Sequence, residues 1–238
     1  MIGRGRLTAV MAFATAALAC GEPRPGEVVL RVVSGTPPGD GDSLVVARGG
    51  DTIVVRAAEL VLREIQLQLV RVGECEEEEG ERCAMVAAGP TRIALPLGAD
   101  TVTLAPVTAV ADTYGTVQLE VYRATPERDS AFLTSHPGLA GVSVRVSGSY
   151  SRAGDRRDFV LTSDANEVLE LALQEVPLVV ANGATSGLLL DVGVARWFLN
   201  ADTTALIDPA TAGPDGPNAA QVRDNIRMSF AVRVPSSP

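Results

Sequence analysis

The chain has 238 residues, of which 46% are hydrophobic and 21% charged, and its formal net charge is −9 at pH 7. This balance is typical of a globular protein rather than a disordered one. All 20 basic residues are arginines, which excludes a P-loop nucleotide site because that motif requires lysine. An acidic chain without a basic stripe is also not expected to bind nucleic acid.

The first nineteen residues have the features of an export signal. Arg4 and Arg6 precede the apolar run Leu7–Ala19, which is shorter than the roughly 20 residues that a membrane-spanning helix needs. A basic start, a short apolar centre and small residues at its end are typical of a cleaved signal peptide. We therefore predict that residues 1–19 are a lipoprotein-type signal peptide and that the protein is exported.

Cys20 directly follows this signal, and the sequence Ala17-Leu18-Ala19-Cys20 resembles the lipobox of bacterial lipoproteins. The resemblance implies a diacylglyceryl group on Cys20 and anchoring on the periplasmic or outer face of the envelope. Residues 20–26, rich in proline and glycine, would then be a short tether. Cleavage after Ala19 by ordinary signal peptidase is the alternative, and it would give a soluble protein with a free Cys20.

The two other cysteines of the chain flank an acidic segment. If Cys20 carries lipid, Cys75 and Cys83 are left to pair, and an exported protein meets an oxidising environment. We expect a disulfide that closes a small loop and stabilises the protein by about 2.5 kcal/mol. The acidic residues of this loop are Glu74, Glu76, Glu77, Glu78, Glu79 and Glu81. We predict a solvated loop tip; calcium capture is the alternative, although consecutive glutamates do not match a known calcium-loop spacing.

Alternation of apolar and polar residues predicts short strands along most of the remaining chain. In Glu59–Val72 the parity of the apolar residues changes, which predicts a β-bulge near Arg63 or Glu64. One short helix is expected near the C-terminus, capped by Asn218, with Val222 and Ile226 on one face. The other predicted strands are Glu27–Val33, Asp51–Arg56, Thr91–Leu97, Asp100–Ala105, Gly115–Arg123, Val142–Tyr150, Arg157–Thr162, Val168–Leu173, Pro177–Ala181, Ser186–Val194 and a final strand from Met228 to Val234.

Many short strands, frequent turn signals and little helix indicate an all-β protein, and we predict an antiparallel β-sandwich. No strong break in composition marks a linker, so residues 27–238 are predicted to form a single domain. Trp197 and Phe198 are expected to close one end of the core. The segment Thr125–Leu139, which contains the only histidine, His136, is predicted to be a polar loop.

The strand pattern from residue 142 to residue 208 resembles a family of exported bacterial lipoproteins known as domain of unknown function 4382. The resemblance is carried by Gly141–Tyr150, Phe159–Leu161, Val176–Val180, Leu188–Val192, Ile207–Pro209 and, earlier in the chain, Asp112–Val121. It implies an exported lipoprotein with a sandwich similar to immunoglobulin or prealbumin folds. It implies no catalytic residues and no cofactor.

The residues available for catalysis are few. His136 is the only histidine, so a serine-hydrolase triad would depend on this single loop residue, and a zinc site built on several histidines is excluded. A glycosidase needs only two carboxylates about 5 to 9 Å apart. The candidates for such a pair are Asp155, Asp158, Asp164, Asp191 and Asp208. The aromatic content of 4% does not favour a stacking platform for sugars.

We therefore expect a lipid-anchored envelope protein that is a non-enzymatic binding or structural module, with no cofactor and no metal site. Its partners would be the membrane, through the lipid on Cys20, and another envelope protein, a peptide or a glycan. The alternatives are a secreted hydrolase that uses paired carboxylates, similar to a glycosidase, and a calcium-dependent adhesion module.

Overall fold

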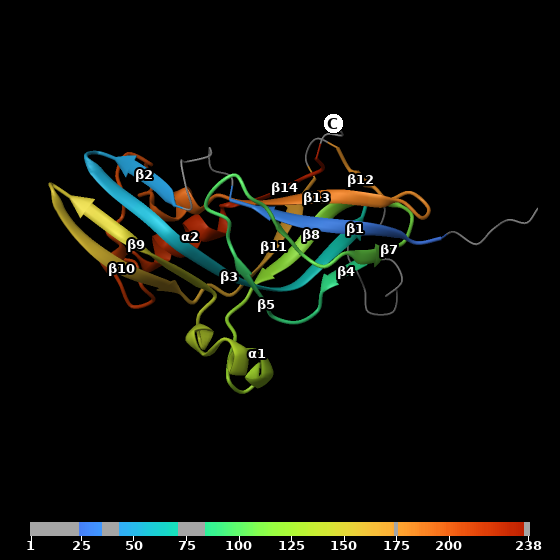
Figure 1. The fold of residues 1–238 in the computed structure, drawn as a ribbon, viewed down its shortest axis with the longest axis horizontal. Helices are drawn as coiled ribbons and strands as arrows, with labels where there is room; N and C mark the ends of the chain where they lie inside the picture. Colours follow the sequence, from blue (N-terminus) through green and yellow to red (C-terminus); the bar gives the residue numbers. More distant parts are fainter. Residues whose placement is uncertain (1–23, 35–42, 71–83, 174–175, 236–238) are drawn as a thin grey trace, which may run out of the picture.

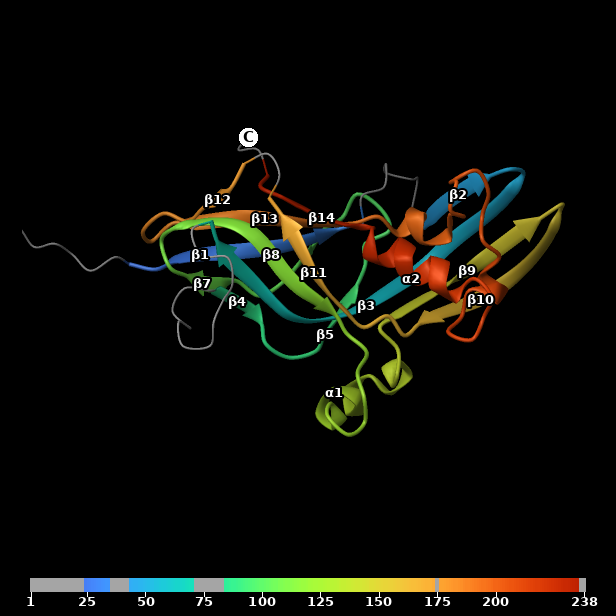
Figure 2. The same ribbon diagram turned by 180° about the vertical axis from the view of Figure 1, so that it is seen from behind.

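The computed structural model describes residues 24–34, 43–70, 84–173 and 176–235. In these residues the protein is mainly β, with two largely antiparallel sheets and two α-helices, one of them near the C-terminus (Figures 1 and 2). The predicted lipid site Cys20, the predicted disulfide Cys75–Cys83 and the acidic loop between these two cysteines lie outside the described residues.

The smaller sheet has five strands in the order β14-β13-β1-β6, with β7 also paired to β1. Its members are β1 (Gly26–Val33), β6 (Val102–Thr103), β7 (Val107–Ala109), β13 (Thr185–Val192) and β14 (Phe230–Arg233). Strand β1 pairs with β13 in parallel, from Glu27 opposite Thr185 to Val33 opposite Asp191. Every other strand pair among the described residues is antiparallel, so the antiparallel prediction is wrong for this pair alone. Alternation within a strand carries no information about its partner, which explains the error.

The larger sheet has nine strands, and its central path is β10-β9-β3-β8-β11. These five are β3 (Asp51–Leu69), β8 (Thr113–Val121), β9 (Val144–Arg152), β10 (Asp155–Ser163) and β11 (Glu167–Ala172). The shorter strands are β2 (Leu44–Arg48), β4 (Ala84–Ala87), β5 (Thr91–Ala94) and β12 (Leu178–Val179). Strand β3 runs along the whole length of the sheet and joins its two ends (Figure 2).

Strand β3 unites two strands that the sequence analysis kept separate, Asp51–Arg56 and the segment that begins at Glu59. Its pairing with β8 shifts register between Arg63 and Gln66, and Glu64 has a φ of 51°. The predicted bulge is therefore confirmed. Because the extra residue reverses the side-chain parity, both Leu62 and Ile65 are fully buried.

Two α-helices lie in the described residues where one was expected. Helix α1 (Ser130–Ser135) and the 3₁₀ turn η2 (Pro137–Leu139) replace the predicted polar loop, because Leu133 and Leu139 pack on Tyr122 in a small apolar cluster. Helix α2 (Ala219–Arg227) is the predicted C-terminal helix, and its Val222 and Ile226 are buried as expected.

The predicted cap of α2 is wrong. Asn218 occupies the N-cap position without a side-chain capping bond. Its Nδ2 atom instead donates to Oγ1 of Thr211 at 2.8 Å, and Gln221 donates to Asn225 at 2.9 Å.

Different elements cover the two ends of the larger sheet. The smaller sheet lies over the end that contains β8 and β11 (Figures 1 and 2). At the other end α2 contacts β10 and two 3₁₀ turns contact β2 and β10, namely η3 (Val194–Phe198) and η4 (Pro209–Thr211). Trp197 and Phe198 of η3 are fully buried at this end. One continuous apolar core runs through both ends of the larger sheet. Among the described residues, no helix is long and apolar enough to cross a membrane.

Candidate functional site

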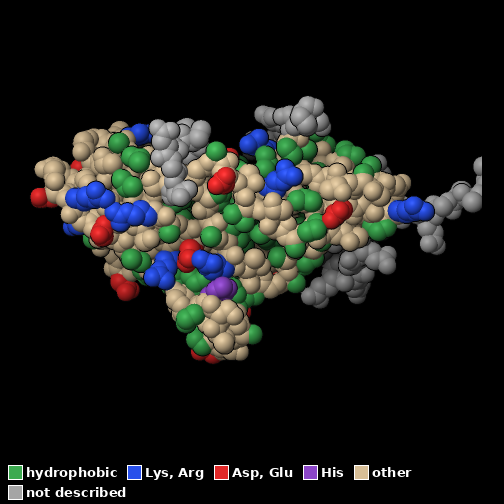
Figure 3. Space-filling view, viewed as in Figure 1, with side chains coloured by type: hydrophobic (Ala, Val, Ile, Leu, Met, Phe, Trp, Pro, Cys, Tyr) green, Lys and Arg blue, Asp and Glu red, His purple; other side chains and the backbone are tan. Residues whose placement is uncertain are grey.

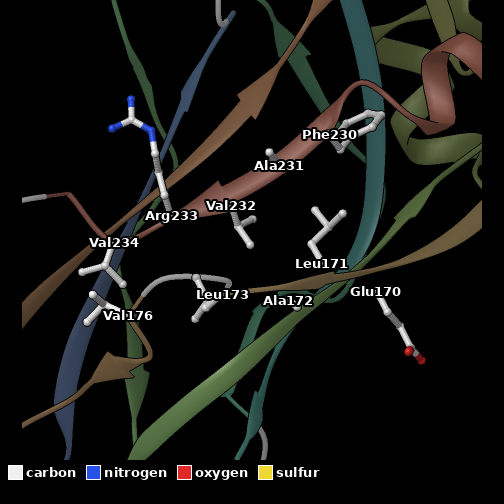
Figure 4. A pocket seen from close by; sticks show the side chains of 10 residues that line it. All are labelled: Glu170, Leu171, Ala172, Leu173, Val176, Phe230, Ala231, Val232, Arg233 and Val234. Carbon is white, nitrogen blue, oxygen red and sulfur yellow. The ribbon is translucent and has the colours of Figure 1, made fainter.

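Two strand edges face each other across a groove on one side of the molecule. Strand β14 ends the smaller sheet, and β11 ends the main path of the larger one. The groove between them has a volume of about 400 Å³ (Figure 4). It is lined by Glu170–Leu173, Val176 and Phe230–Val234.

The main chains of both strands point hydrogen-bonding groups toward this groove that pair with no other strand among the described residues. In an antiparallel pair alternate residues bond to the partner strand, and the residues between them point their N–H and C=O groups the other way. The N–H of Leu173 donates to the C=O of Gly115 at 2.9 Å, so Leu171 and Leu169 of β11 also bond toward β8. The peptide groups of Val168, Glu170 and Ala172 therefore face away from β8.

The same reasoning applies to β14. The N–H of Gly193 donates to the C=O of Ser229 at 2.8 Å, which places Ala231 and Arg233 in hydrogen-bonded pairs with β13. The peptide groups of Phe230 and Val232 consequently point off the free edge. A row of unpaired groups of this kind is a template for pairing with a further strand.

Apolar side chains of the core and of its margin line this groove. The inward side chains of Leu173, Phe230 and Val232 retain 7 to 8% of their surface, whereas Leu190 and Val192 on the neighbouring strand β13 are completely buried. Leu171 and Val234 are only half-buried. Partly exposed apolar side chains thus lie between the edges of the two sheets.

A second groove, with a volume of about 600 Å³, shares Val176 and Val234 with the first. It continues past β12 and the start of β13, and its lining includes Arg31. Val176 and Val179 are 58% and 61% exposed there. The two grooves therefore adjoin at Val176 and Val234.

Charged side chains mark the rim of the first groove. In Figure 4, Arg233 and Glu170 lie at opposite ends of the lining and both extend away from its apolar floor. Arg233 forms no ion pair with any described residue. Burial raises the pKa of Asp191 on β13, and the nearby charge of Arg233 lowers it in part.

A polar cleft of about 480 Å³ lies elsewhere, between the larger sheet and the start of the α1 segment. Nε of Arg63 donates to Oε2 of Glu120 at 2.8 Å, and Nδ2 of Asn166 donates to Oε1 of the same carboxylate at 3.5 Å. The Tyr122 hydroxyl donates to Oδ2 of Asp129 at 2.8 Å. Burial, together with the hydrogen bond and charge of Asp129, raises the pKa of Tyr122. Because these charged groups already have partners within the protein, we assign the network to holding the α1 segment in place.

The carboxylates considered for hydrolysis are distributed over different ion pairs. Asp158 pairs with Arg56 at 3.0 Å, Asp164 pairs with Arg223 at 3.0 Å, and Asp208 pairs with Arg157. None of these aspartates, nor Asp155 or Asp191, lines either of the two grooves. Within the part of the chain that the structure describes, no group of three or more His, Cys, Asp or Glu is placed to hold a metal ion. His136 is half-buried with its ring centroid 4.9 Å from that of Phe132.

Opposite charges alternate over the surface drawn in Figure 3, where arginines and acidic side chains are interspersed and the α1 segment protrudes below the sheets. This view shows no broad area of a single charge sign. A nucleic-acid partner would need such an area.

No known family model matches the chain, and no curated protein matches it. The resemblance to domain of unknown function 4382 therefore stays a prediction. Among solved structures, the fold is similar to that of MbnP from Methylosinus trichosporium, with a TM-score of 0.45 and 11% sequence identity. The similarity covers 91% of this chain and 100% of that one.

Proposed function

We propose that this protein is an exported, lipid-anchored binding module of the bacterial envelope, with an immunoglobulin- or prealbumin-like sandwich and no catalytic activity of its own. It would hold another envelope component in the groove between β11 and β14. The groove carries this proposal because it combines two strand edges that pair with no further described strand and apolar side chains that are partly exposed. Soluble proteins seldom leave both features exposed at one place, since such edges invite association.

The export signal and the lipid anchor that the sequence predicts also support the proposal. A lipid on Cys20 would keep the protein close to membrane-associated partners, and the tether ends where β1 begins at Gly26. Mass spectrometry of the native protein tests this part: we expect diacylglyceryl mass on Cys20 after loss of residues 1–19. An unmodified Cys20 in the native protein would contradict the anchor and leave a secreted form.

Site-specific photocrosslinking in intact cells tests the groove. A benzophenone amino acid replaces Ala172 or Ala231, two small, exposed residues that line the groove from opposite strands. Ala47 on β2, equally exposed and remote from the groove, is the matched control. We expect a discrete crosslinked species from both groove positions and none from the control position. If the groove positions give no more crosslinking than the control, the groove is not the binding site.

A further inference from the structure

We infer that one tip of the molecule, the end at which the chain enters its first strand, rests on the lipid surface that holds Cys20. The tip consists of the start of β1 and of residues 105–111 and 176–186. The inference rests on the lipid anchor in the proposed function and is independent of the groove. It adds a second membrane contact, made by the folded body itself, which fixes how the protein stands on the membrane.

The three segments of the tip are distant in the sequence and meet at one place. Gly26 at the start of β1 pairs with Ala109 of β7. A Cβ atom at Gly26 would lie only 2.5 Å from Cγ1 of Val180, and the N–H of Val180 donates to the C=O of Asp112 at 2.9 Å. Both ribbon views show β7, β12 and the start of β1 at the same end of the longest axis (Figures 1 and 2).

The predicted lipid site is close to the tip along the chain. Gly26 is the sixth residue after Cys20, and six residues span at most about 20 Å even when fully extended. Strand β3, with 19 residues, has a path of about 60 Å between the two ends of the larger sheet. An anchor on Cys20 therefore holds the tip at the membrane surface, while the opposite end of the body lies beyond the reach of the tether.

The tip is depleted of charged side chains. Residues 105–111 and 176–186 contain no aspartate, glutamate or arginine, whereas about four charged residues would be expected at the chain average of 21%. Charged residues begin at the margin of the tip, with Arg24, Glu27 and Asp112. A charged side chain is costly to move from water toward the acyl chains of a bilayer. The two uncharged segments can approach the lipid without that cost.

The tip also exposes apolar side chains. Val110 is 47% exposed and Val179 is 61% exposed. Exposed valines are individually ordinary on a protein surface, and two of them would not hold a free protein on a bilayer. Tethering makes the second contact intramolecular, with an effective concentration in the millimolar range, so a small apolar contact is enough to orient an anchored protein. The molecule then stands end-on, with its long axis leading away from the lipid.

Tryptophan fluorescence tests this contact in the native lipidated protein, purified in detergent and reconstituted into vesicles of phosphatidylcholine with brominated acyl chains. Tryptophan replaces Val110 or Val179. Val45 of β2, 60% exposed at the opposite end, is the matched control (Figure 1). Trp197 is fully buried and gives the same background in every protein. Compared with unbrominated vesicles, we expect the added fluorescence of Val110→Trp and Val179→Trp to fall by about half, and that of Val45→Trp by less than about a tenth.

A charge introduced into the tip provides a second test. Val110→Glu is combined with Val179→Trp, and the carboxylate should lift the tip from the lipid because its burial against acyl chains is unfavourable. We expect quenching to fall to the level of Val45→Trp. Val45→Glu in the same Val179→Trp protein is the control and should leave the quenching unchanged. Circular dichroism checks that each variant folds; the two tip tryptophans decide the question if Val110→Glu does not.

Flotation of the vesicles separates this inference from the anchor itself. Protein that floats with the vesicles but is quenched no more at Val110 and Val179 than at Val45 would overturn the end-on contact and leave the anchor intact. Stronger quenching at Val45 than at the tip would overturn it as well. A benzophenone at Val110 that crosslinks two copies, without lipid quenching, would assign the tip to a second copy instead. Protein that does not float would remove the anchor and the inference together.

Discussion

Arg63 and Glu120 form an ion pair at the point where β3 is bulged. Nε of Arg63 lies 2.8 Å from Oε2 of Glu120, and the guanidinium carbon of Arg63 lies 4.1 Å from the centre of the Tyr122 ring. The side chain of Glu120 is only 9% exposed. The carboxylate therefore depends on Arg63 for its charge balance, and the arginine in turn connects the larger sheet to the tyrosine beneath the α1 segment.

Removing this arginine should destabilise the protein. Arg63→Ala leaves the buried carboxylate of Glu120 without its charged partner, and we expect the free energy of unfolding to fall by about 2–3 kcal/mol. Urea unfolding at neutral pH measures the change. Arg56→Ala is the control, because its pair with Asp158 is 47% and 77% exposed and should contribute less than about 0.5 kcal/mol. Equal losses in the two variants would contradict the role of the Arg63–Glu120 pair.

Gly148 of β9 is predicted to tolerate no side chain. A Cβ atom at this position would lie 2.1 Å from the carbonyl oxygen of Val54 on β3. Gly148→Ala must push apart two central strands of the larger sheet, and we expect a loss of about 3 kcal/mol in thermal or urea unfolding. Gly89→Ala, where no atom lies within 4 Å of the new Cβ, should change stability by less than about 0.5 kcal/mol. A mild effect at Gly148 would mean that β3 and β9 can separate easily.

The only tryptophan reports on the end of the core beneath α2. Nε1 of Trp197 donates to Oγ of Ser229 at 2.8 Å, and that hydroxyl donates to the carbonyl of Ile226 at 2.6 Å. Ser229→Ala leaves a buried indole N–H unsatisfied and should lower the free energy of unfolding by about 1–2 kcal/mol. Tryptophan fluorescence follows the unfolding directly. Ser135→Ala, at an exposed position, should have almost no effect, and comparable losses in both variants would refute the prediction.

Tyr150 should make stability fall at alkaline pH. Burial raises its pKa to about 12, and the hydrogen bond to Oδ2 of Asp51, at 2.7 Å, and the charge of Asp51 act in the same direction. In the unfolded chain a tyrosine has a pKa of about 10. Below that pH the hydroxyl is protonated in both states and its stabilising contribution is complete. As the pH rises from about 10 to about 12 the unfolded state releases the proton first, so stability is lost.

Urea unfolding at a series of pH values from about 8 to about 11.5 tests this dependence. Tyr150→Phe cannot ionise, so its stability should decline less steeply over the upper part of the range. At pH 8 the variant should already be weaker by about 1 kcal/mol, because it lacks the hydrogen bond to Asp51. Identical alkaline slopes for the two proteins would show that Tyr150 ionises freely in the folded state.

The sequence predicted most of the strands because alternation reports directly on burial. Val117, Leu119 and Val121 are buried as their pattern required, and the bulge beside Arg63 followed from a change of parity. The alternation in Gly115–Arg123 places Glu120 on the polar face, yet its side chain is buried. Its side chain is covered by the ion pair with Arg63 and by the adjacent α1 segment. The alternation of residues along a strand carries no information about covering by another element.

The groove could not have been predicted in the same way. The sequences of β11 and β14 each indicate a strand with one buried face, but they do not state which strand lies at an edge. That property depends on pairings between distant segments, as does the parallel match of β1 with β13. Helix α1 escaped prediction because six residues are too few to show helical periodicity; Leu133 and the Tyr122–Asp129 hydrogen bond hold it in place.

The parallel pairing of β1 with β13 joins segments that lie far apart in the sequence. The side chains of Glu27 and Thr185 are joined by a hydrogen bond across 158 positions of sequence. Strand β1 lies at the centre of its sheet and finds this partner only after most of the polypeptide has been synthesised. Contacts of such long range form late and slowly. The smaller sheet, and with it the edge of β14, can therefore be completed only after β13 (Thr185–Val192) and β14 (Phe230–Arg233) are available.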